Sequence, residues 1–270
     1  MKLHWSKITF PLIGIFLLFF MFQACQKSVG TDNQPSHMNI YLTDAPGNYK
    51  EVLIDIQSVL IKSANDTSSQ GWVTVPLLKP GIYNLLDLRN GNDTLLGGVD
   101  LPAGEVSQIR LVLGDNNSLV LEDGTVVPLK TPSAQQSGLK LNVNANLSPG
   151  IPYELVMDFD AARSIVKAGN SGQYILKPVI RTFAKATGGG IQGVVLPDAA
   201  KAQVMAVSTT DTLGALPDAS GFYKFWGIPA GSYTLIFAAD SASAYHSDTL
   251  KNISVTTGNI TTVDTVRLVH

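Results

Sequence analysis

Alternation of apolar and polar residues runs through most of the chain after residue 36, and it constrains the fold more than any other feature. In HMNIYLTDAP, for example, Met38, Ile40 and Leu42 fall on one face of an extended strand. The same pattern recurs in further segments: GWVTVPLL, EVSQIRLVLG, NSLVLEDGTVVPLK, LKLNVNANL, PYELVMDFD and QYILKPVIRTF. Turn-forming pairs such as Asp123-Gly124 separate these segments at short intervals. The pattern therefore predicts an all-β chain built of antiparallel β-sandwiches.

Three segments depart from regular alternation. In VLIDIQSVLIKS the apolar positions change parity between Ile56 and Val59, which predicts a β-bulge. DAARSIVKAG predicts a single short helix, with Asp160 as its N-cap and Gly169 at its end. TLLGGVDLP is too rich in glycine to favour a stable helix.

A run of three glycines follows the last strand of the first half, in Thr187-Gly188-Gly189-Gly190. Such a run predicts a hinge, because glycine adds backbone freedom. We therefore expect two domains, at residues 37–186 and 187–270, each an antiparallel β-sandwich.

Residues 1–24 have the parts of a secretory signal peptide. Lys2 and Lys7 precede an apolar run at residues 10–22, no acidic residue occurs in the first thirty, and Ala24 is the small residue before a processing point. At about 13 residues the run is shorter than the roughly 20 that a membrane-spanning helix needs, so we expect removal rather than a transmembrane anchor.

Cys25 is the only cysteine, and it directly follows this segment. It resembles the lipidated cysteine of bacterial lipoproteins, although Phe22 stands where such sequences usually have Leu. The resemblance implies a diacylglycerol on the Cys25 sulfur, an acyl chain such as palmitate on the new amino terminus, and a tether at residues 25–36. It also implies the cell envelope, in the outer membrane of a Gram-negative bacterium. The alternative is a secreted protein with one spare thiol.

The second half carries the segment DASGFYKFWGIPAGSYTLIFAA, in which turns at Asp218–Gly221 and Pro229–Gly231 flank alternating strands. With the opening Gly193-Val194-Val195, this segment resembles the carboxypeptidase regulatory-like domain, a small transthyretin-like β-sandwich. The resemblance implies a carbohydrate-binding-like fold that serves as a spacer or adaptor. It implies no peptidase, and the chain has no HxxE zinc motif.

The first half resembles DUF4382, a bacterial family of unknown function often found in envelope lipoproteins. The similarity covers roughly residues 36–184, and its main motifs are Leu42-Thr43-Asp44-Ala45-Pro46, Leu101-Pro102-Ala103-Gly104, Ser137-Gly138-Leu139-Lys140-Leu141 and Lys177-Pro178-Val179-Ile180-Arg181. The resemblance implies location and fold, and assigns no activity.

Three carboxylates are the candidate metal ligands: Asp44, Asp158 and Asp160. Asp158 and Asp160 straddle one residue, so in a strand both point to one face. Together the three could hold Ca²⁺, which takes six to eight oxygen ligands, and two of them could serve a glycosidase. We favour a structural role, in which Asp44 and Asp160 cap turns or helices and Asp158 pairs with Arg110 or Arg181.

Trp226 is the candidate ligand-binding aromatic, because it lies next to Gly227 in a turn-rich segment. An exposed ring there could stack on the C–H face of a sugar, whereas the alternative is core packing.

Charge and missing motifs restrict the function classes. Removal of residues 1–24 would take away two lysines and change the formal net charge from −2 to −4. Nucleic acids are polyanions, so a negative net charge without a basic patch argues against a nucleic-acid partner. The chain has no GxSxG, HExxH, Walker A or CxxC motif. We therefore predict a lipid-anchored protein without enzymatic activity or cofactor, which binds a glycan or scaffolds other envelope proteins. The alternatives are a purely structural spacer and, less favoured, a glycan-acting hydrolase that uses Asp158 and Asp160.

Overall fold

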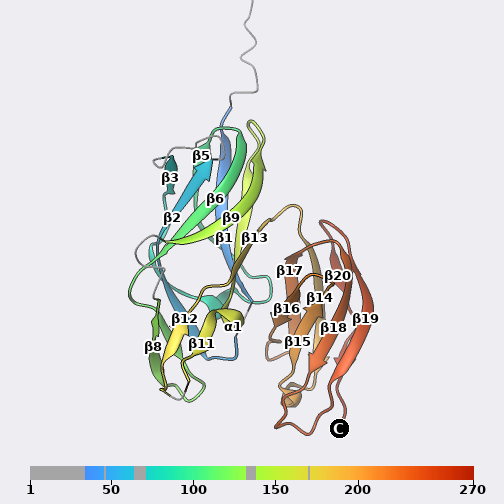
Figure 1. Cartoon of the computed structure of the whole chain (residues 1–270). Coiled ribbons are helices and arrows are strands. Elements are labelled where there is room, and N and C mark those ends of the chain that lie inside the picture. The colour runs from blue at the N-terminus through green and yellow to red at the C-terminus, as the bar shows by residue number, and fades with distance from the viewer. Residues whose placement is uncertain (1–33, 46, 64–70, 132–137, 170) are drawn as a thin grey trace, which may run out of the picture. The chain divides into compact units, whose positions relative to one another are not determined.

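The computed structural model describes residues 34–45, 47–63, 71–131, 138–169 and 171–270 (Figure 1). The predicted signal peptide, Cys25 and most of the predicted tether lie outside these residues. The described residues are nearly all in strands and turns, so the prediction of an all-β fold is confirmed. Among them, no helix is long and apolar enough to cross a membrane.

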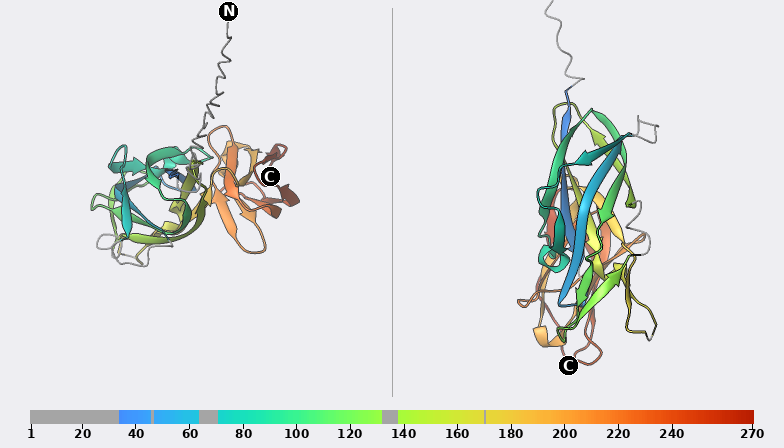
Figure 2. Two further views of the ribbon diagram at one scale, coloured as in Figure 1. Left: turned by 90° about the horizontal axis from the view of Figure 1, so that it is seen from above. Right: turned by 90° about the vertical axis from the view of Figure 1, so that its left-hand side faces the viewer.

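The first half of the chain forms two sheets around one core, as two further views show (Figure 2). One sheet has the order β13-β10-β1-β5, and the other has the order β11-β12-β8-β7-β2-β6-β9, with β3 and β4 also paired to β2. Their bounds are β1 Ser36–Ala45, β2 Glu51–Ser63, β3 Trp72–Val75, β4 Gly81–Asn84, β5 Thr94–Leu101, β6 Gly104–Leu113, β7 Ser118–Val120, β8 Val126–Lys130, β9 Leu139–Leu147, β10 Tyr153–Asp160, β11 Ile165–Lys167, β12 Tyr174–Leu176 and β13 Ile180–Ala184. Two short helices accompany them, η2 at Leu85–Leu88 and α1 at Ala161–Ser164.

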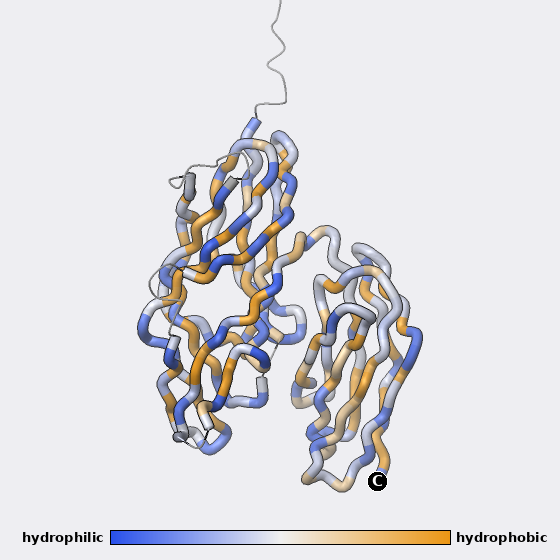
Figure 3. The backbone as a smooth tube through the Cα atoms, viewed as in Figure 1, coloured by the Kyte–Doolittle hydropathy of each residue, from blue (hydrophilic) through white to orange (hydrophobic). Residues whose placement is uncertain are grey.

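Apolar and polar residues alternate along the strands, as the coloured tube in Figure 3 shows, and the apolar ones form the buried cores. Met38, Ile40 and Leu42 of β1 are fully buried, as the sequence predicts. In β2 the register against β6 shifts between Ile56 and Ser58, which confirms the predicted bulge. The bulge keeps both apolar parities of β2 inside the core.

The pairing within the sheets is mixed rather than purely antiparallel. β1 pairs with β10 in parallel, with Met38 opposite Tyr153 and Ala45 opposite Asp160. β12 also pairs with β8 in parallel. Parallel neighbours need long connections, and the sequence pattern within each strand carries no information about which distant strand it meets.

The predicted helix is shorter than expected. Asp160 is its N-cap, since the Asp160 side chain accepts a hydrogen bond from the Arg163 N–H at 2.8 Å, but α1 ends at Ser164. The next residues join strand β11, because the β-branched pair Ile165-Val166 favours a strand. The glycine-rich segment TLLGGVDLP forms β5, where a Cβ on Gly97 would overlap the Pro76 carbonyl.

The second half forms two further sheets around a separate core. One has the order β17-β14-β20, with β21 also paired to β14, and the other has the order β16-β15-β18-β19. Their bounds are β14 Gly189–Leu196, η3 Asp198–Ala200, β15 Gln203–Val207, β16 Thr212–Ala215, β17 Phe222–Ile228, β18 Gly231–Ala238, β19 Asp248–Val255, β20 Ile260–Thr262 and β21 Val266–Arg267.

The glycine run between the two cores is packed rather than open. Gly189 and Gly190 are buried in β14, and a Cβ on Gly188 would overlap the backbone of Gly227. Contacts group residues Thr31–His270 as one compact unit. The division into two domains at residue 187 therefore stays a prediction.

Candidate functional site

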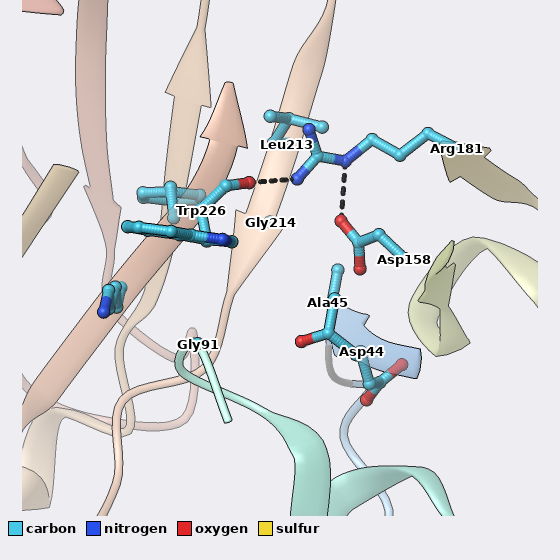
Figure 4. A pocket seen from close by; sticks show the side chains of 11 residues that line it. Asp44, Ala45, Gly91, Asp158, Arg181, Leu213, Gly214 and Trp226 are labelled. Atoms are coloured by element: carbon cyan, nitrogen blue, oxygen red, sulfur yellow. Dashed lines mark hydrogen bonds and ion pairs between the residues drawn. The ribbon is translucent and has the colours of Figure 1, made fainter. Parts of the chain in front are cut away.

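Arg181 joins the first β-sandwich to the second. Its Nε donates to the Asp158 carboxylate at 2.6 Å and its Nη2 to the Trp226 carbonyl at 2.6 Å (Figure 4). Its Nη1 donates to the Gly227 carbonyl at 2.8 Å. The predicted pairing of Arg181 with Asp158 is confirmed. One guanidinium thus ties β10 to β17 with three hydrogen bonds.

Strand register and one glycine produce this junction. Asp158 and Arg181 lie directly opposite each other in the antiparallel pair β10–β13, where facing side chains of opposite charge attract. Across the junction, Phe183 packs against Gly227, and a Cβ on Gly227 would overlap the Phe183 ring. Gly227 also has φ of +62°, a conformation that glycine adopts without a steric penalty.

Asp44 is a buried carboxylate with an unpartnered oxygen. Its Oδ1 accepts a hydrogen bond from the Ala161 N–H at 3.2 Å, and its Oδ2 has no partner. Burial raises the pKa of Asp44 well above its ordinary range, and the charges of Asp158 and Asp160 raise it further. Burial also raises the pKa of Asp158, although the Arg181 charge acts in the opposite direction.

The three predicted metal ligands do not converge. Asp44 lies opposite Phe159 in the parallel pair β1–β10, so its side chain is on the other face from Asp158 and Asp160. Asp160 caps α1 and pairs with Arg163 Nε at 2.6 Å. Within the described ranges, no group of three or more His, Cys, Asp or Glu side chains is placed to hold a metal ion. Calcium binding at these residues stays a prediction.

Trp226 is half-buried at the junction rather than exposed. The Lys224 Nζ lies 4.8 Å from the centre of its ring. The adjoining cavity, which Asp158 and Arg181 also line, measures about 20 Å³. That volume holds about one water molecule. The cavity is therefore too small for a sugar, and ligand binding by Trp226 stays a prediction.

A larger cleft of about 650 Å³ lies beside the junction, lined by both sandwiches. Its volume is in the range of roughly 300–1,000 Å³ typical of small-ligand sites. The polar and aromatic side chains that line it include Asn48, Tyr49, Arg89, Glu122, Lys201 and Gln203.

Two charged groups of this cleft are unpaired. Among the residues that the structure describes, the side chains of Arg89 and Glu122 make no hydrogen bond or ion pair, whereas Lys201 pairs with Asp198 at 2.6 Å. The cleft thus offers a free cation, a free carboxylate, two amides and an aromatic ring. Sequence reasoning missed it, because its residues come from separate turns with no common spacing.

Of the two arginines predicted as partners of Asp158, Arg110 does not form the pair. The Arg110 guanidinium lies over the Trp72 ring instead, with its Cζ 4.1 Å from the ring centre. No carboxylate in the described part of the chain is within ion-pair distance of Arg110. An aromatic face therefore satisfies this cation by a cation–π contact.

Residues 36–178 match the family model described as "Domain of unknown function (DUF4382)". No curated protein matches the chain.

Three solved structures that are similar to the chain have low TM-scores. One is a type II cohesin–X-dockerin complex from Acetivibrio cellulolyticus, with a TM-score of 0.25 and 22% identity over 30% of this chain and 57% of that chain. Another is the Bacillus anthracis TIE protein, with a TM-score of 0.23 and 11% identity over 87% of this chain and 34% of that chain. A shaft pilin from Lactobacillus rhamnosus GG has a TM-score of 0.23 and 10% identity over 87% of this chain and 97% of that chain. The chain therefore spans just over half of the first of these chains and about a third of the second, and scores this low support no functional conclusion.

Proposed function

The chain belongs to the DUF4382 family, and on this premise we propose that it is a non-catalytic envelope protein that binds a glycan in the cleft between its sandwiches. The lining of the cleft carries this proposal. Sugars present many hydroxyl groups, which need donors and acceptors of both kinds, and Arg89, Glu122, Asn48 and Gln203 supply them. Tyr49 supplies a half-buried ring for the apolar face of a sugar.

Affinity electrophoresis of the full-length chain in a non-ionic detergent, through gels with neutral polysaccharides, tests the proposal. We expect one glycan to retard the protein. Arg89→Gln should weaken this binding about tenfold, because a hydrogen bond from a charged donor contributes about 1.5–3 kcal/mol. Arg267→Gln, which makes the same change at an exposed position in β21, should bind as the wild type does.

Calcium and EDTA arms of this experiment address the metal prediction. Retardation that EDTA abolishes would show that glycan binding depends on a metal ion, and retardation that EDTA leaves unchanged would show that it does not. Equal mobility in every polysaccharide gel would contradict the glycan proposal.

A structural spacer is the second candidate function, and the junction favours it. Arg181 fixes two carbonyls of β17 to the first sandwich, and Asn90 Nδ2 lies 3.4 Å from the Leu216 carbonyl and 3.3 Å from the Phe222 carbonyl. Such contacts suit a protein that holds partners at a fixed separation. A glycan-acting hydrolase is less well supported, because Asp158 and Asp160 are each occupied by an arginine.

The proposal includes a lipid anchor at Cys25 and a place in the outer membrane. We expect the wild-type protein to partition into the detergent phase of Triton X-114, because several acyl chains give stable membrane anchoring. Cys25→Ser should prevent acylation and leave residues 1–24 attached, so the variant should have the mass of the unmodified full-length chain. Ser28→Ala, a control three residues away, should behave as the wild type. A mature wild-type protein with the mass of the unmodified chain would contradict the anchor.

A further inference from the structure

The sheet formed by β3, β2, β6 and β9 has one face against the core and one face outside (Figure 1). Register places two rows of side chains across the outer face. One row is Trp72, Lys62, Gln108 and Asn142, and the other is Thr74, Leu60, Arg110 and Lys140. Strands lie about 4.8 Å apart, so four of them make a face about 14 Å across. We call these eight residues the Trp72 face.

Basic and amide side chains gather around the aromatic ring of this face. Arg110 Cζ lies 4.1 Å from the centre of the Trp72 ring, and Lys62 Nζ lies 5.9 Å from it. Gln108 Nε2 is 3.5 Å from Asn142 Oδ1, at the limit of a hydrogen bond. Lys140 and Asn142 are exposed, while Trp72, Arg110 and Gln108 are half-buried.

Arg110 is held by stacking and retains free donors. Its Nε is buried without a hydrogen-bond partner, whereas its two terminal nitrogens are not among the buried unpartnered atoms and have no partner in the described residues. Those nitrogens therefore reach solvent. A guanidinium stacked on an indole is oriented in advance, so it loses less freedom when it binds a carboxylate or sulfate.

The charge of the Trp72 face differs from that of the whole chain. The face carries Lys62, Arg110 and Lys140 and no acidic residue, with Glu105 as the neighbouring acid on β6. The whole chain has a formal net charge of −2. A local basic surface on an acidic protein is complementary to an anion.

We infer that the Trp72 face binds an anionic polysaccharide, a chain of sugar rings that carries carboxylate or sulfate groups. The basic side chains match its charges, the amides of Gln108 and Asn142 match its hydroxyls, and Trp72 provides an apolar surface beside them. A phospholipid surface would need the charges but not the amides. This inference extends the proposed glycan-binding role, yet it uses no residue of the cleft.

Affinity electrophoresis of the full-length chain with polygalacturonate as the probe tests this inference. We expect retardation that weakens as salt is added, since exposed charges are screened. The double variant Arg110→Gln/Lys140→Gln should raise the dissociation constant about tenfold or more, because two charged contacts are lost. Fully methyl-esterified polygalacturonate has the same backbone without the charges and should not retard the wild type.

Matched controls separate this surface from the cleft. Lys251→Gln/Arg267→Gln removes two positive charges from exposed strands of the second sandwich and should leave polygalacturonate binding unchanged. Arg89→Gln should also leave it unchanged, so failure of the cleft proposal is distinguishable from failure of this one. Wild-type binding by Arg110→Gln/Lys140→Gln would overturn the inference. Binding to phosphatidylglycerol vesicles but not to polygalacturonate, lost in the same double variant, would overturn the choice of ligand.

Discussion

Arg181→Met should lower the free energy of unfolding by about 3 kcal/mol, the lower end of the range for breaking a buried ion pair. The Arg181 side chain is 27% exposed, so solvent screens part of its charge, but its partner Asp158 is only 7% exposed. The variant leaves the Asp158 carboxylate buried without its counter-charge, and the Trp226 and Gly227 carbonyls lose their donors. Urea unfolding followed by tryptophan fluorescence measures the change, because Trp226 lies at the junction itself.

Two further variants make this expectation specific. Arg163→Met removes a cation that is 46% exposed, and its partner Asp160 keeps the hydrogen bond from the backbone N–H of residue 163, so this variant should lose less stability than Arg181→Met. Arg181→Met/Asp158→Asn should be more stable than Arg181→Met alone, because the double variant leaves no buried charge behind. A double variant no more stable than Arg181→Met would show that Arg181 does not compensate the Asp158 charge in solution.

Asp44→Asn should raise the free energy of unfolding at neutral pH by about 1–3 kcal/mol, because it removes the cost of ionising a buried carboxyl group. The pKa of Asp44 in the folded protein lies well above its ordinary value of 3.8. The folded protein therefore holds the Asp44 proton more tightly than the unfolded chain does. The stability that comes from this proton is fully present below pH 3.8 and is lost as the pH rises through the folded pKa. The asparagine amide cannot ionise, so the variant avoids the cost of a buried negative charge at neutral pH.

The pH dependence is the sharper readout of this substitution. Wild-type stability should fall as the pH rises from about 4 toward neutral, and Asp44→Asn should flatten that slope. Asp55→Asn is the matched control: Asp55 is also buried, but it accepts hydrogen bonds from the Gln57 side chain and from the backbone and side chain of Asn116. That substitution should destabilise the protein. A loss of stability in both variants would contradict the distinction between the two carboxylates.

Local features of the fold were predictable because the information lay within a few residues. The bulge in β2 followed from a change of parity, and the hairpin at Asp123-Gly124 followed from its turn chemistry, with β7 and β8 paired across it. The ion pair of Arg181 with Asp158 was predictable because a cation within an apolar strand needs a partner.

Features that depend on distant packing were not predictable. Arg110 contacts Trp72 rather than a carboxylate. The order of strands in the sheet decides which side chains become neighbours, and the sequence around Arg110 does not contain that order. Glycine in TLLGGVDLP disfavours a helix, but the structure shows a second reason for Gly97. This residue of β5 has no Cβ, so the Pro76 carbonyl can lie close to its backbone. The cleft around Arg89 and Tyr49 arises only when loops of two sandwiches meet, and no motif marks such a surface.

The parallel pairing of β1 with β10 governs the order in which the first sandwich can be completed. Ser36, at the start of β1, bonds to the Ile151 carbonyl, a partner 115 residues later in the chain. During synthesis, β1 leaves the ribosome long before its partner strand β10 has been made. Contacts of such long sequence separation form slowly. The first sandwich can therefore close only after β10, near the end of that half of the chain, has been synthesised.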